Sequence, residues 1–322
     1  MTRAFDDVGS RWLAAMRAGD WEAAWQQTDR IEAARRRAQR EPGFERGPGQ
    51  LVWDGSDLRG RSVLVRCEHG LGDTLQFSRF FPWLCAQASE LHVMAQPQLL
   101  PLLRGVPGFG QVHDGWAGPD WPAHELEIEV MELAYASRAT PATVPPPAAG
   151  LRARLTPGLP GAPPADGRLR AGLLWAASGW DTSRSIPAPE LAPLLDLAGV
   201  QWFALQQGDA ASDPALQGAP LEPLWRHTGG VWAAARAMLA LDLVVCVDGM
   251  PAHLAGSLGC PTWLLLKHDA DWRWGASGER TPWYASMRLF RQPAAGEWRS
   301  VIARIAGELD RLASPTRRSG AR

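Results

Sequence analysis

Residues 61–88 read RSVLVRCEHGLGDTLQFSRFFPWLCAQA, and this stretch decides the fold class. Residues 61–66 form a β-rich run that stops at a turn with two glycines, and residues 74–88 then carry apolar side chains at helical spacing. A strand, a glycine turn and a helix in this order make the opening unit of an α/β sheet. We therefore expect an α/β protein whose first sheet begins here.

The same alternation of strands and helices recurs along the chain in two series. The first series continues with a strand at 91–96 and further elements near 124–135. The strands of the second series are continuous apolar runs, which is typical of parallel strands covered on both faces. They are expected at 169–177, 201–206, 242–247 and 261–266. Two such series predict two Rossmann-like, doubly wound domains that face a cleft, with ligands at the carboxyl ends of the strands.

The segments outside the two series complete the expected organisation. Residues 6–40 predict two amphipathic helices that break at Ala18-Gly19-Asp20, a hairpin too short to be stable without packing on another part of the chain. Residues 141–164 contain eight prolines, which disfavour a regular helix or a central strand. The expected divisions are a helical hairpin at 1–45, a first domain at 46–140, a proline-rich linker at 141–167, a second domain at 168–296, a closing helix at 297–313 and a loose tail at 314–322.

Composition excludes several classes of protein. The chain has 322 residues, with 33 Lys and Arg against 34 Asp and Glu, and this balance argues against a nucleic-acid partner. Lys267 is the single lysine and follows a leucine, so no Walker A loop is present and a pyridoxal enzyme is disfavoured. No Cys/His cluster has the spacing of a zinc site, and no metal is expected.

Location is predicted from the cysteines and from hydrophobicity. The four cysteines are scattered, without a C-x-x-C pair, which fits reduced thiols and a cytoplasmic protein. The first thirty residues carry charges throughout and lack the apolar run of a signal peptide. No apolar run approaches 18 residues, so no transmembrane segment is expected.

The turn at 68–74 is the first candidate site. Gly70 and Gly72 let the backbone approach a ligand closely and direct amide groups at an anion, and the helix dipole favours such binding. Asp73 is a candidate general base there. The alternative is that its carboxylate only caps the helix.

The second candidate site is Asp248-Gly249-Met250-Pro251-Ala252-His253, at the end of the strand 242–247. Pro251 fits the first position of a helix, whose amino terminus suits a diphosphate. Asp248 is a candidate for accepting hydrogen bonds from ribose or sugar hydroxyls, and His253 for donating to phosphate. A capping aspartate and an interior histidine are equally compatible with this spacing.

Two further segments carry weaker signals. Arg184, in Ser183-Arg184-Ser185-Ile186-Pro187, is a candidate for bidentate phosphate binding, although arginine is abundant enough for a plain surface role. Asp269 and Asp271 resemble a metal-binding carboxylate pair, but two carboxylates alone make a poor metal site, so a loop role is favoured. The aromatic residues that follow offer flat faces for a base or sugar, or else belong to the core. They are Trp272, Trp274, Trp283 and Tyr284.

Several motifs come in the order of one known family. They are GLGDTLQFSRFFP, RSIP, VDGMPAHLAGSLG and DWRW followed by PWYASMRLFRQ. Together they resemble the catalytic half of bacterial tetratricopeptide-linked glycosyltransferases, which are relatives of the lipopolysaccharide heptosyltransferases. The resemblance covers about residues 45–313, and AGDWEAAW in the hairpin is similar to a remnant of the repeat array. It implies the GT-B fold, with the acceptor on the amino-terminal half, the nucleotide sugar on the carboxy-terminal half and no cofactor or metal.

The resemblance also implies roles for individual residues. Asp73 matches the family's proposed base, and the turn residues Gly70, Gly72, Thr74 and Gln76 accompany it on the acceptor side. On the donor side, Arg184 matches a phosphate contact and Asp248 a sugar or ribose contact. His253, with the helix amides near Gly249 and Met250, matches a diphosphate contact.

The function expected from the resemblance is metal-independent, inverting transfer of a sugar from a nucleotide-diphosphate donor to a cell-envelope glycan or to a protein such as flagellin. The sequence departs from the family pattern at four places: His69 replaces a common glutamine, Gly249 a hydroxyl residue and Lys267 a proline, and the segment between Trp175 and Arg184 is short. The short segment and Gly249 favour the main alternative, an inactive scaffold of the same fold that binds a protein partner through its hairpin, whereas Asp73, Asp248 and His253 together favour the enzyme. A third reading is a nucleotide-sugar epimerase.

Overall fold

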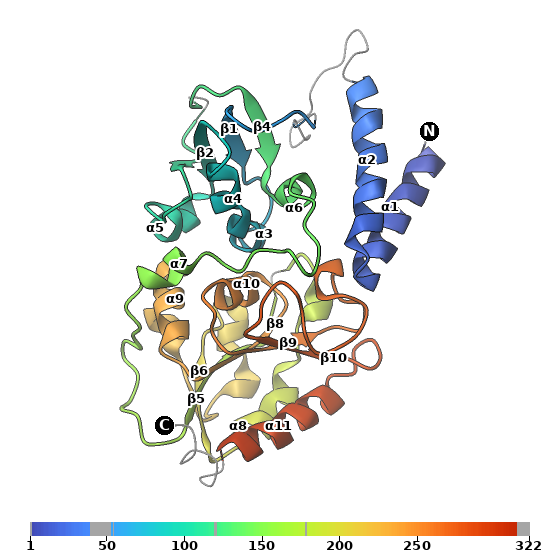
Figure 1. Cartoon of the computed structure of the whole chain (residues 1–322). Coiled ribbons are helices and arrows are strands. Elements are labelled where there is room, and N and C mark those ends of the chain that lie inside the picture. Colours follow the sequence, from blue (N-terminus) through green and yellow to red (C-terminus); the bar gives the residue numbers. More distant parts are fainter. Residues whose placement is uncertain (1, 39–52, 54, 119–120, 178, 314–322) are drawn as a thin grey trace. The chain divides into compact units, whose positions relative to one another are not determined.

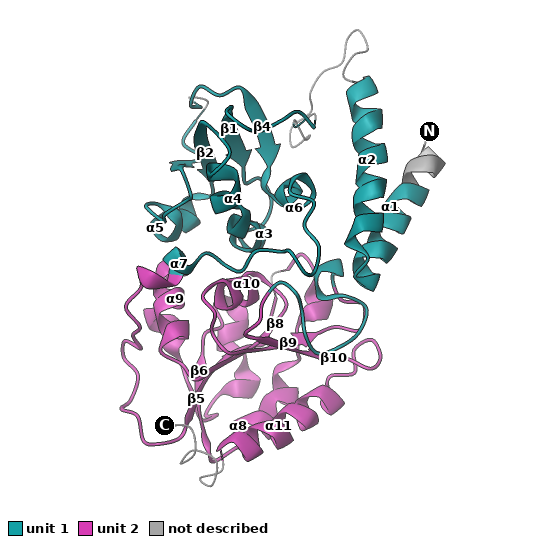
Figure 2. Cartoon of the chain, viewed as in Figure 1, with its two compact units in different colours: residues 1–151, 271–283 teal, residues 152–270, 284–322 magenta. Residues whose placement is uncertain are grey.

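The computed structural model describes residues 2–38, 53, 55–118, 121–177 and 179–313, with the side chains of residues 2–6 left aside. The predicted tail at 314–322 and the end of the predicted hairpin, residues 39–45, lie outside this part. The chain forms two units, and each is described by itself (Figure 2). Unit 1 comprises Met1–Leu151 and Asp271–Trp283, and unit 2 comprises Arg152–Ala270 and Tyr284–Arg322. The segment 271–283 thus belongs to unit 1, although the sequence placed it inside the second domain.

Unit 1 contains a parallel sheet of four strands in the order β3-β2-β1-β4 (Figure 1). Its strands are β1 (Ser62–Arg66), β2 (Glu90–Ala95), β3 (Gln111–Asp114) and β4 (Leu126–Glu129). The strand expected at 61–66 is confirmed, and its three central residues, Val63, Leu64 and Val65, are completely buried. In the register of β1 with β4, Arg66 is opposite Glu129, so both strands end at the same edge.

Short helices connect these strands. They are α3 (Leu71–Phe77), η1 (Ser78–Phe80), α4 (Phe81–Cys85), η2 (Pro97–Leu99), α5 (Leu100–Leu103), η3 (Val130–Glu132), α6 (Leu133–Ala136) and α7 (Ala149–Ala153), at which the chain passes into unit 2. Apart from α7, the proline-rich stretch 141–164 contains no regular helix or strand. This agrees with the restriction that proline places on the backbone.

The amino-terminal hairpin is confirmed and consists of α1 (Thr2–Ala18) and α2 (Trp21–Ala38). Gly19 lies between them at φ 79°, a left-handed conformation that glycine adopts without strain. Trp21 stacks on Trp283 with ring centroids 4.7 Å apart, and the Trp25 indole donates a hydrogen bond to the carbonyl of Ala139 over 2.6 Å. The hairpin therefore packs within unit 1, which supplies the support that a single helical pair needs.

Unit 2 contains a parallel sheet of six strands in the order β10-β9-β8-β5-β6-β7. The strands are β5 (Leu169–Leu174), β6 (Val200–Ala204), β7 (Leu221–Glu222), β8 (Leu243–Val247), β9 (Thr262–Leu266) and β10 (Met287–Arg291). The four apolar runs expected as strands are confirmed as β5, β6, β8 and β9. The sequence analysis did not predict β3, β7 or β10, which are all terminal strands of their sheets.

Helices cover both faces of this second sheet, as the continuous apolar strands require (Figure 1). Trp202, Val245 and Leu265 share one buried cluster with Ile302 and Ile305 of the closing helix. The opposite face carries α10, which contacts β8 and β9. The helices are α8 (Ala192–Leu195), α9 (Val231–Leu239), α10 (Met250–Ser257) and α11 (Arg299–Ala313), with the 3-10 turns η4 (Thr182–Arg184), η5 (Ala188–Leu191), η6 (Asp209–Ser212), η7 (Pro214–Leu216) and η8 (Leu224–His227).

Candidate functional site

Each sheet has one place where the strand order reverses. In unit 1 the chain runs outward from β1 to β2 and β3 and then returns to the other side of β1 with β4. In unit 2 it runs from β5 to β6 and β7 and returns with β8. Parallel α/β sheets bind ligands at the carboxyl ends of the strands that flank such a reversal. The predicted site residues follow β1, β5 and β8, so they lie at these two edges.

Asp73 lies in the first turn of α3, beyond the end of β1. Its Oδ2 accepts a hydrogen bond of 3.0 Å from the amide of Gly70, the residue that precedes the helix. Its Oδ1 forms an ion pair with the guanidinium of Arg273. The capping role that the sequence left open is therefore present, and both carboxylate oxygens have partners.

Arg273 was not singled out by the sequence analysis, yet it is the residue that holds Asp73. It belongs to η9 (Trp272–Trp274), and its side chain is only 9% exposed. Nε donates to Oε1 of Gln76 over 2.8 Å, and Nη1 is 3.0 Å from Oδ1 of Asp271. One buried guanidinium thus joins the segment 271–283 to helix α3.

The remaining predicted acceptor residues serve the interior of unit 1. Gly72, Thr74 and Gln76 are buried. The Thr74 hydroxyl donates to Oε1 of Gln96 over 2.9 Å, while Gln76 receives Arg273. These residues hold the turn in place.

Glu129 ends β4 and was also missed by the sequence analysis. The residue is 8% exposed, and its Oε2 accepts a hydrogen bond of 2.7 Å from the amide of Met131. Burial raises its pKa to about 7, and the charges of Asp73 and Glu68 add to this effect. The alternating pattern of residues 126–129 could have indicated that Glu129 points to one face of the sheet. It could not have indicated that β4 lies next to β1, where the strand order reverses.

The edge between β5 and β8 in unit 2 carries cations. Arg184 lies in η4 and donates to the backbone carbonyl of Asp248 across the reversal, over 3.3 Å. Lys267 follows β9, and its Nζ is 2.9 Å from Oδ2 of Asp181 and 3.3 Å from the hydroxyl of Ser183. The hydrogen bond from Lys267 lowers the pKa of Asp181 to about 2. Lys267 therefore lies beside the turn that carries Arg184, which the sequence analysis did not predict.

The predicted residues around α10 divide into open and enclosed ones. Gly249 and Met250 are partly exposed, whereas Asp248 and His253 are 8% and 6% exposed. Nδ1 of His253 is 3.0 Å from the hydroxyl of Tyr284. In the structure His253 is therefore an interior histidine with a polar partner, the alternative that the sequence analysis left open. Gly249 has extended backbone, and a Cβ there would meet only Pro251 at an ordinary 3.6 Å, so the fold does not require glycine.

The aromatic candidates of the segment 272–284 belong to the core. Trp274, Trp283 and Tyr284 are each 1% exposed, and Trp272 packs edge-on against Trp12 with centroids 5.1 Å apart. An exposed indole occurs instead at Trp180, whose ring lies 5.5 Å from the Arg184 guanidinium. Within the described residues, no group of three or more His, Cys, Asp or Glu is placed to hold a metal ion. Asp271 forms an ion pair with Arg273, which fits the loop role expected for it in place of metal binding.

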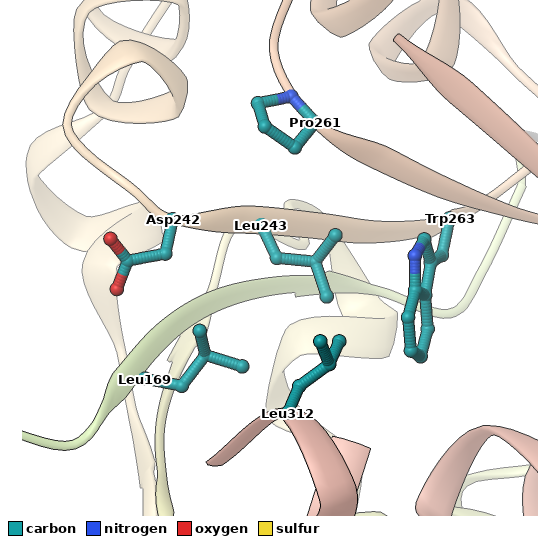
Figure 3. A pocket seen from close by; sticks show the side chains of 6 residues that line it. All are labelled: Leu169, Asp242, Leu243, Pro261, Trp263 and Leu312. Atoms are coloured by element: carbon teal, nitrogen blue, oxygen red, sulfur yellow. The ribbon is translucent and has the colours of Figure 1, made fainter. Parts of the chain in front are cut away.

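A pocket of about 460 Å³ lies at the opposite end of the second sheet (Figure 3). The amino-terminal ends of β5, β8 and β9 line it, together with the end of α11. Its lining residues are Leu169, Asp242, Leu243, Pro261, Trp263 and Leu312. The predicted donor residues follow the carboxyl ends of the strands, where parallel sheets bind ligands. This pocket lies at the amino ends of the strands and is therefore separate from them.

Two other general features bear on the candidate chemistry. The four cysteines are free, and burial raises the pKa of the Cys67 and Cys246 thiols well above the usual range, which excludes both as nucleophiles. None of the helices in the described part combines the length and hydropathy needed to cross a membrane.

Comparison with known proteins gives a fold and one distant relative. No family model matches the chain. Protein FlbA of Caulobacter vibrioides is 26% identical over 299 residues, which are 81% of this chain and 48% of the relative. The chain therefore spans about half the length of the curated relative it matches.

The solved structures that resemble this chain include two glycosyltransferases. A glycosyl transferase of family 9 from Veillonella parvula has a TM-score of 0.53 and 12% identity, and the match covers 80% of this chain and 99% of that one. The ADP-heptose lipopolysaccharide heptosyltransferase II of Escherichia coli has a TM-score of 0.54 and 15% identity, with 78% and 98% covered. At these identities the likeness shows the fold alone, an α/β fold with two parallel sheets.

Proposed function

We propose that this chain is a glycosyltransferase that moves a sugar from a nucleotide-diphosphate donor to a hydroxyl of a cell-envelope glycan or protein. Its two sheets then serve as the two Rossmann-like domains of the GT-B type, with the donor on unit 2 and the acceptor on unit 1. The tetratricopeptide origin of the hairpin and the cytoplasmic location stay predictions from the sequence.

The observation that carries this proposal is the pair of cations beside the β5/β8 reversal. Arg184 lies in the short turn that begins at Asp181, Lys267 reaches the same turn from the loop after β9, and both pair with the Asp181 carboxylate. Helix α10 begins at the same edge with Pro251 in its first turn. Charged side chains next to a helix amino terminus are the arrangement that binds a diphosphate.

The proposed reaction is a single displacement with inversion. The acceptor hydroxyl approaches the carboxylates beside the β1/β4 reversal, where Asp73 is the candidate from the sequence. Charge develops on the leaving nucleoside diphosphate, and Arg184 and Lys267 stabilise it without a metal ion. Asp248 accepts a hydrogen bond from the ribose or the sugar, with Gly249, Met250 and His253 beside the diphosphate.

Donor binding is testable before any acceptor is known. Thermal stability is measured with ADP, GDP, UDP and CMP sugars and with the free nucleotides, since a ligand of the native state raises the melting temperature by mass action. We expect a shift for one nucleotide that disappears in Asp248→Ala. Asp242→Ala is the matched control, because Asp242 precedes the same strand at its opposite end and lines the pocket of Figure 3.

A catalytically inactive binding module is the second candidate, favoured by the structural role of Asp73, which caps α3 and pairs with Arg273. It predicts no shift with any nucleotide sugar, or a shift without consumption of the donor. A shift that disappears in Asp242→Ala instead would assign the nucleotide to the pocket and contradict the proposed donor site. Interconversion of free nucleotide sugars without transfer would indicate an epimerase.

A further inference from the structure

Trp180 is an exposed indole beside the proposed donor residues for which the proposed function gives no role. Within the described residues three tryptophans are exposed, and Trp180 is the most exposed of them at 87%. It follows β5 at the carboxyl end of the strand and lies just before η4, the turn that carries Arg184. Trp180 therefore lies at the edge where the second sheet is expected to bind its ligand.

Hydrogen bonds fix the backbone close to Trp180. At the base of the turn, the amide of Ile186 donates to the carbonyl of Trp175 over 2.8 Å. Directly after the indole, the Asp181 carboxylate caps η4 by accepting the amide of Ser183 over 3.1 Å. The turn is thus held in place by its own contacts, while the indole next to it has little cover.

One contact of the indole ring is with a cation. Cζ of Arg184 lies 5.5 Å from the centroid of the Trp180 ring, within the range of a cation–π interaction. Nε and Nη1 of the same guanidinium donate to the carbonyls of Asp181 and Asp248, each over 3.3 Å. Arg184 is thus held between the indole and the residue that precedes α10. At 87% exposure, most of the indole surface stays open to a ligand.

The edge between β5 and β8 therefore offers two kinds of contact side by side. Arg184 and Lys267 provide positive charge for phosphate. Trp180 provides a flat apolar face, on which a nucleobase stacks. A ribose separates the base of a nucleotide from its diphosphate, so a ring next to a phosphate-binding cation is in a position to receive the base. A pyranose is puckered and carries hydroxyls around its ring, so stacking favours the base over the sugar.

We propose that Trp180 stacks on the nucleobase of the donor while the neighbouring cations hold its diphosphate. The inference rests on the proposed function, because it takes the diphosphate to lie at Arg184 and Lys267. When the donor binds, the apolar surface of the indole becomes buried against the base. Because every base has a π face, Trp180 distinguishes a nucleotide from a bare diphosphate and does not select among bases.

The test compares the binding of nucleoside diphosphates with that of inorganic pyrophosphate, which has no base. ADP, GDP, UDP and pyrophosphate are each titrated calorimetrically into the full chain. The variants are Trp180→Ala, Trp180→Phe and Arg184→Met. Trp116→Ala is the matched control, because Trp116 is also exposed, at 66%, but belongs to unit 1. Replacement of so exposed a side chain should leave the melting temperature close to that of the wild type.

We expect Trp180→Ala to raise the Kd of the nucleoside diphosphate that binds the wild type by roughly 5–150-fold, the range that stacking of one base on an aromatic side chain contributes. The Kd of pyrophosphate should stay unchanged in this variant. Trp180→Phe should recover most of the affinity, because a phenyl face also stacks. Arg184→Met should weaken both ligands, and Trp116→Ala should weaken neither.

A readout independent of affinity is ¹⁹F NMR of protein labelled with fluorotryptophan. The Trp180 signal is the one that is missing from the spectrum of Trp180→Phe. We expect this signal to shift when the nucleoside diphosphate binds, because the ring current of the base acts on the indole. Pyrophosphate should shift it much less.

The inference is overturned, while the donor site stands, if Trp180→Ala binds the nucleoside diphosphate as tightly as the wild type. Equal losses of nucleoside diphosphate and pyrophosphate also overturn it, because Trp180 would then act only by supporting Arg184. A loss confined to the intact nucleotide sugar overturns it as well and assigns the indole to the sugar. A wild type that binds neither nucleoside diphosphates nor pyrophosphate overturns the proposed donor site itself, which is a different result.

Discussion

The two strand reversals have the same topology and opposite charge. In unit 1 the edge between β1 and β4 carries Glu129 and Asp73, and the cation nearest to Asp73 is a buried arginine that is already shared among three side chains. In unit 2 the edge between β5 and β8 carries Arg184 and Lys267 on short loops with access to solvent. A parallel sheet thus provides only the place for a site, and the loops decide which ligand chemistry it receives.

The difference extends to how firmly each edge is built. The acidic edge is braced by the segment 271–283, whose aromatic side chains pack against those of the hairpin, Trp283 stacked on Trp21 and Trp272 edge-on to Trp12. The cationic edge is held by two partly exposed ion pairs, from Lys267 and Arg184 to Asp181, and by a few hydrogen bonds. Exposed ion pairs contribute little to stability, whereas buried ones are costly to break. Substitutions at the acidic edge should therefore affect stability, and those at the cationic edge should affect binding.

The largest effect is expected for Arg273→Met. The change leaves Asp73 and Asp271 without their shared cation and Gln76 without its donor. Breaking a buried pair costs on the order of 3–5 kcal/mol, and we expect about 3 kcal/mol because both carboxylates keep some contact with water. For a unit of this size the melting temperature should fall by about 6–12 °C, as measured by calorimetry.

The control for this variant is Arg280→Met, in the same segment but on the exposed surface. It should change the melting temperature by less than about 2 °C, as surface substitutions usually do. If Arg273→Met melts within 2 °C of the wild type, the acidic edge is not braced in the way that we describe, and the contrast between the two edges fails.

The second effect is expected at Lys267. Lys267→Met removes one of the two cations of the cationic edge, and a charge-assisted hydrogen bond to phosphate contributes about 1.5–3 kcal/mol. The Kd of the stabilising nucleoside diphosphate should rise by roughly 10–100-fold, measured by titration calorimetry. Lys267→Arg should recover most of the affinity, and Arg311→Met on α11 should leave it unchanged. Equal affinity of Lys267→Met and wild type would remove Lys267 from the donor site.

The sequence predicted the elements of both edges better than their contacts. Apolar runs indicated β1, β5, β6, β8 and β9, because a strand covered on both faces can only be apolar. The turn before α3 was predicted from its glycines, and the cap by Asp73 from its place in the first turn. These features depend on neighbours within a few residues, which the sequence displays directly.

The contacts that depend on distant parts of the chain were not predictable in this way. Asp73 and Arg273 are 200 residues apart, and nothing local to DWRW indicates that it packs on α3. The same holds for Glu129, which gains its surroundings from the order of the strands, and for His253, which finds Tyr284 from another loop. An arginine-rich sequence also hides the guanidinium of Arg273, whose side chain is only 9% exposed.

The smallest effect concerns Glu132, three residues beyond Glu129, and it tests how the acidic edge is joined to the hairpin. Burial raises the pKa of Glu132 to about 8, partly offset by Arg35 of α2, which also pairs with Glu32.

The unfolded chain loses this proton near pH 4.5 and the folded chain near pH 8, so stability contributed by Glu132 is present below pH 4.5 and is lost as the pH rises to about 8. Glu132→Gln stays neutral and should lack this loss. We therefore expect the variant to stay close to the wild type near pH 5 and to exceed it by at least about 1 kcal/mol, or about 2 °C or more in melting temperature, at pH 9. A variant that is less stable than the wild type at pH 9 would show that the Arg35 ion pair outweighs the burial of the carboxylate.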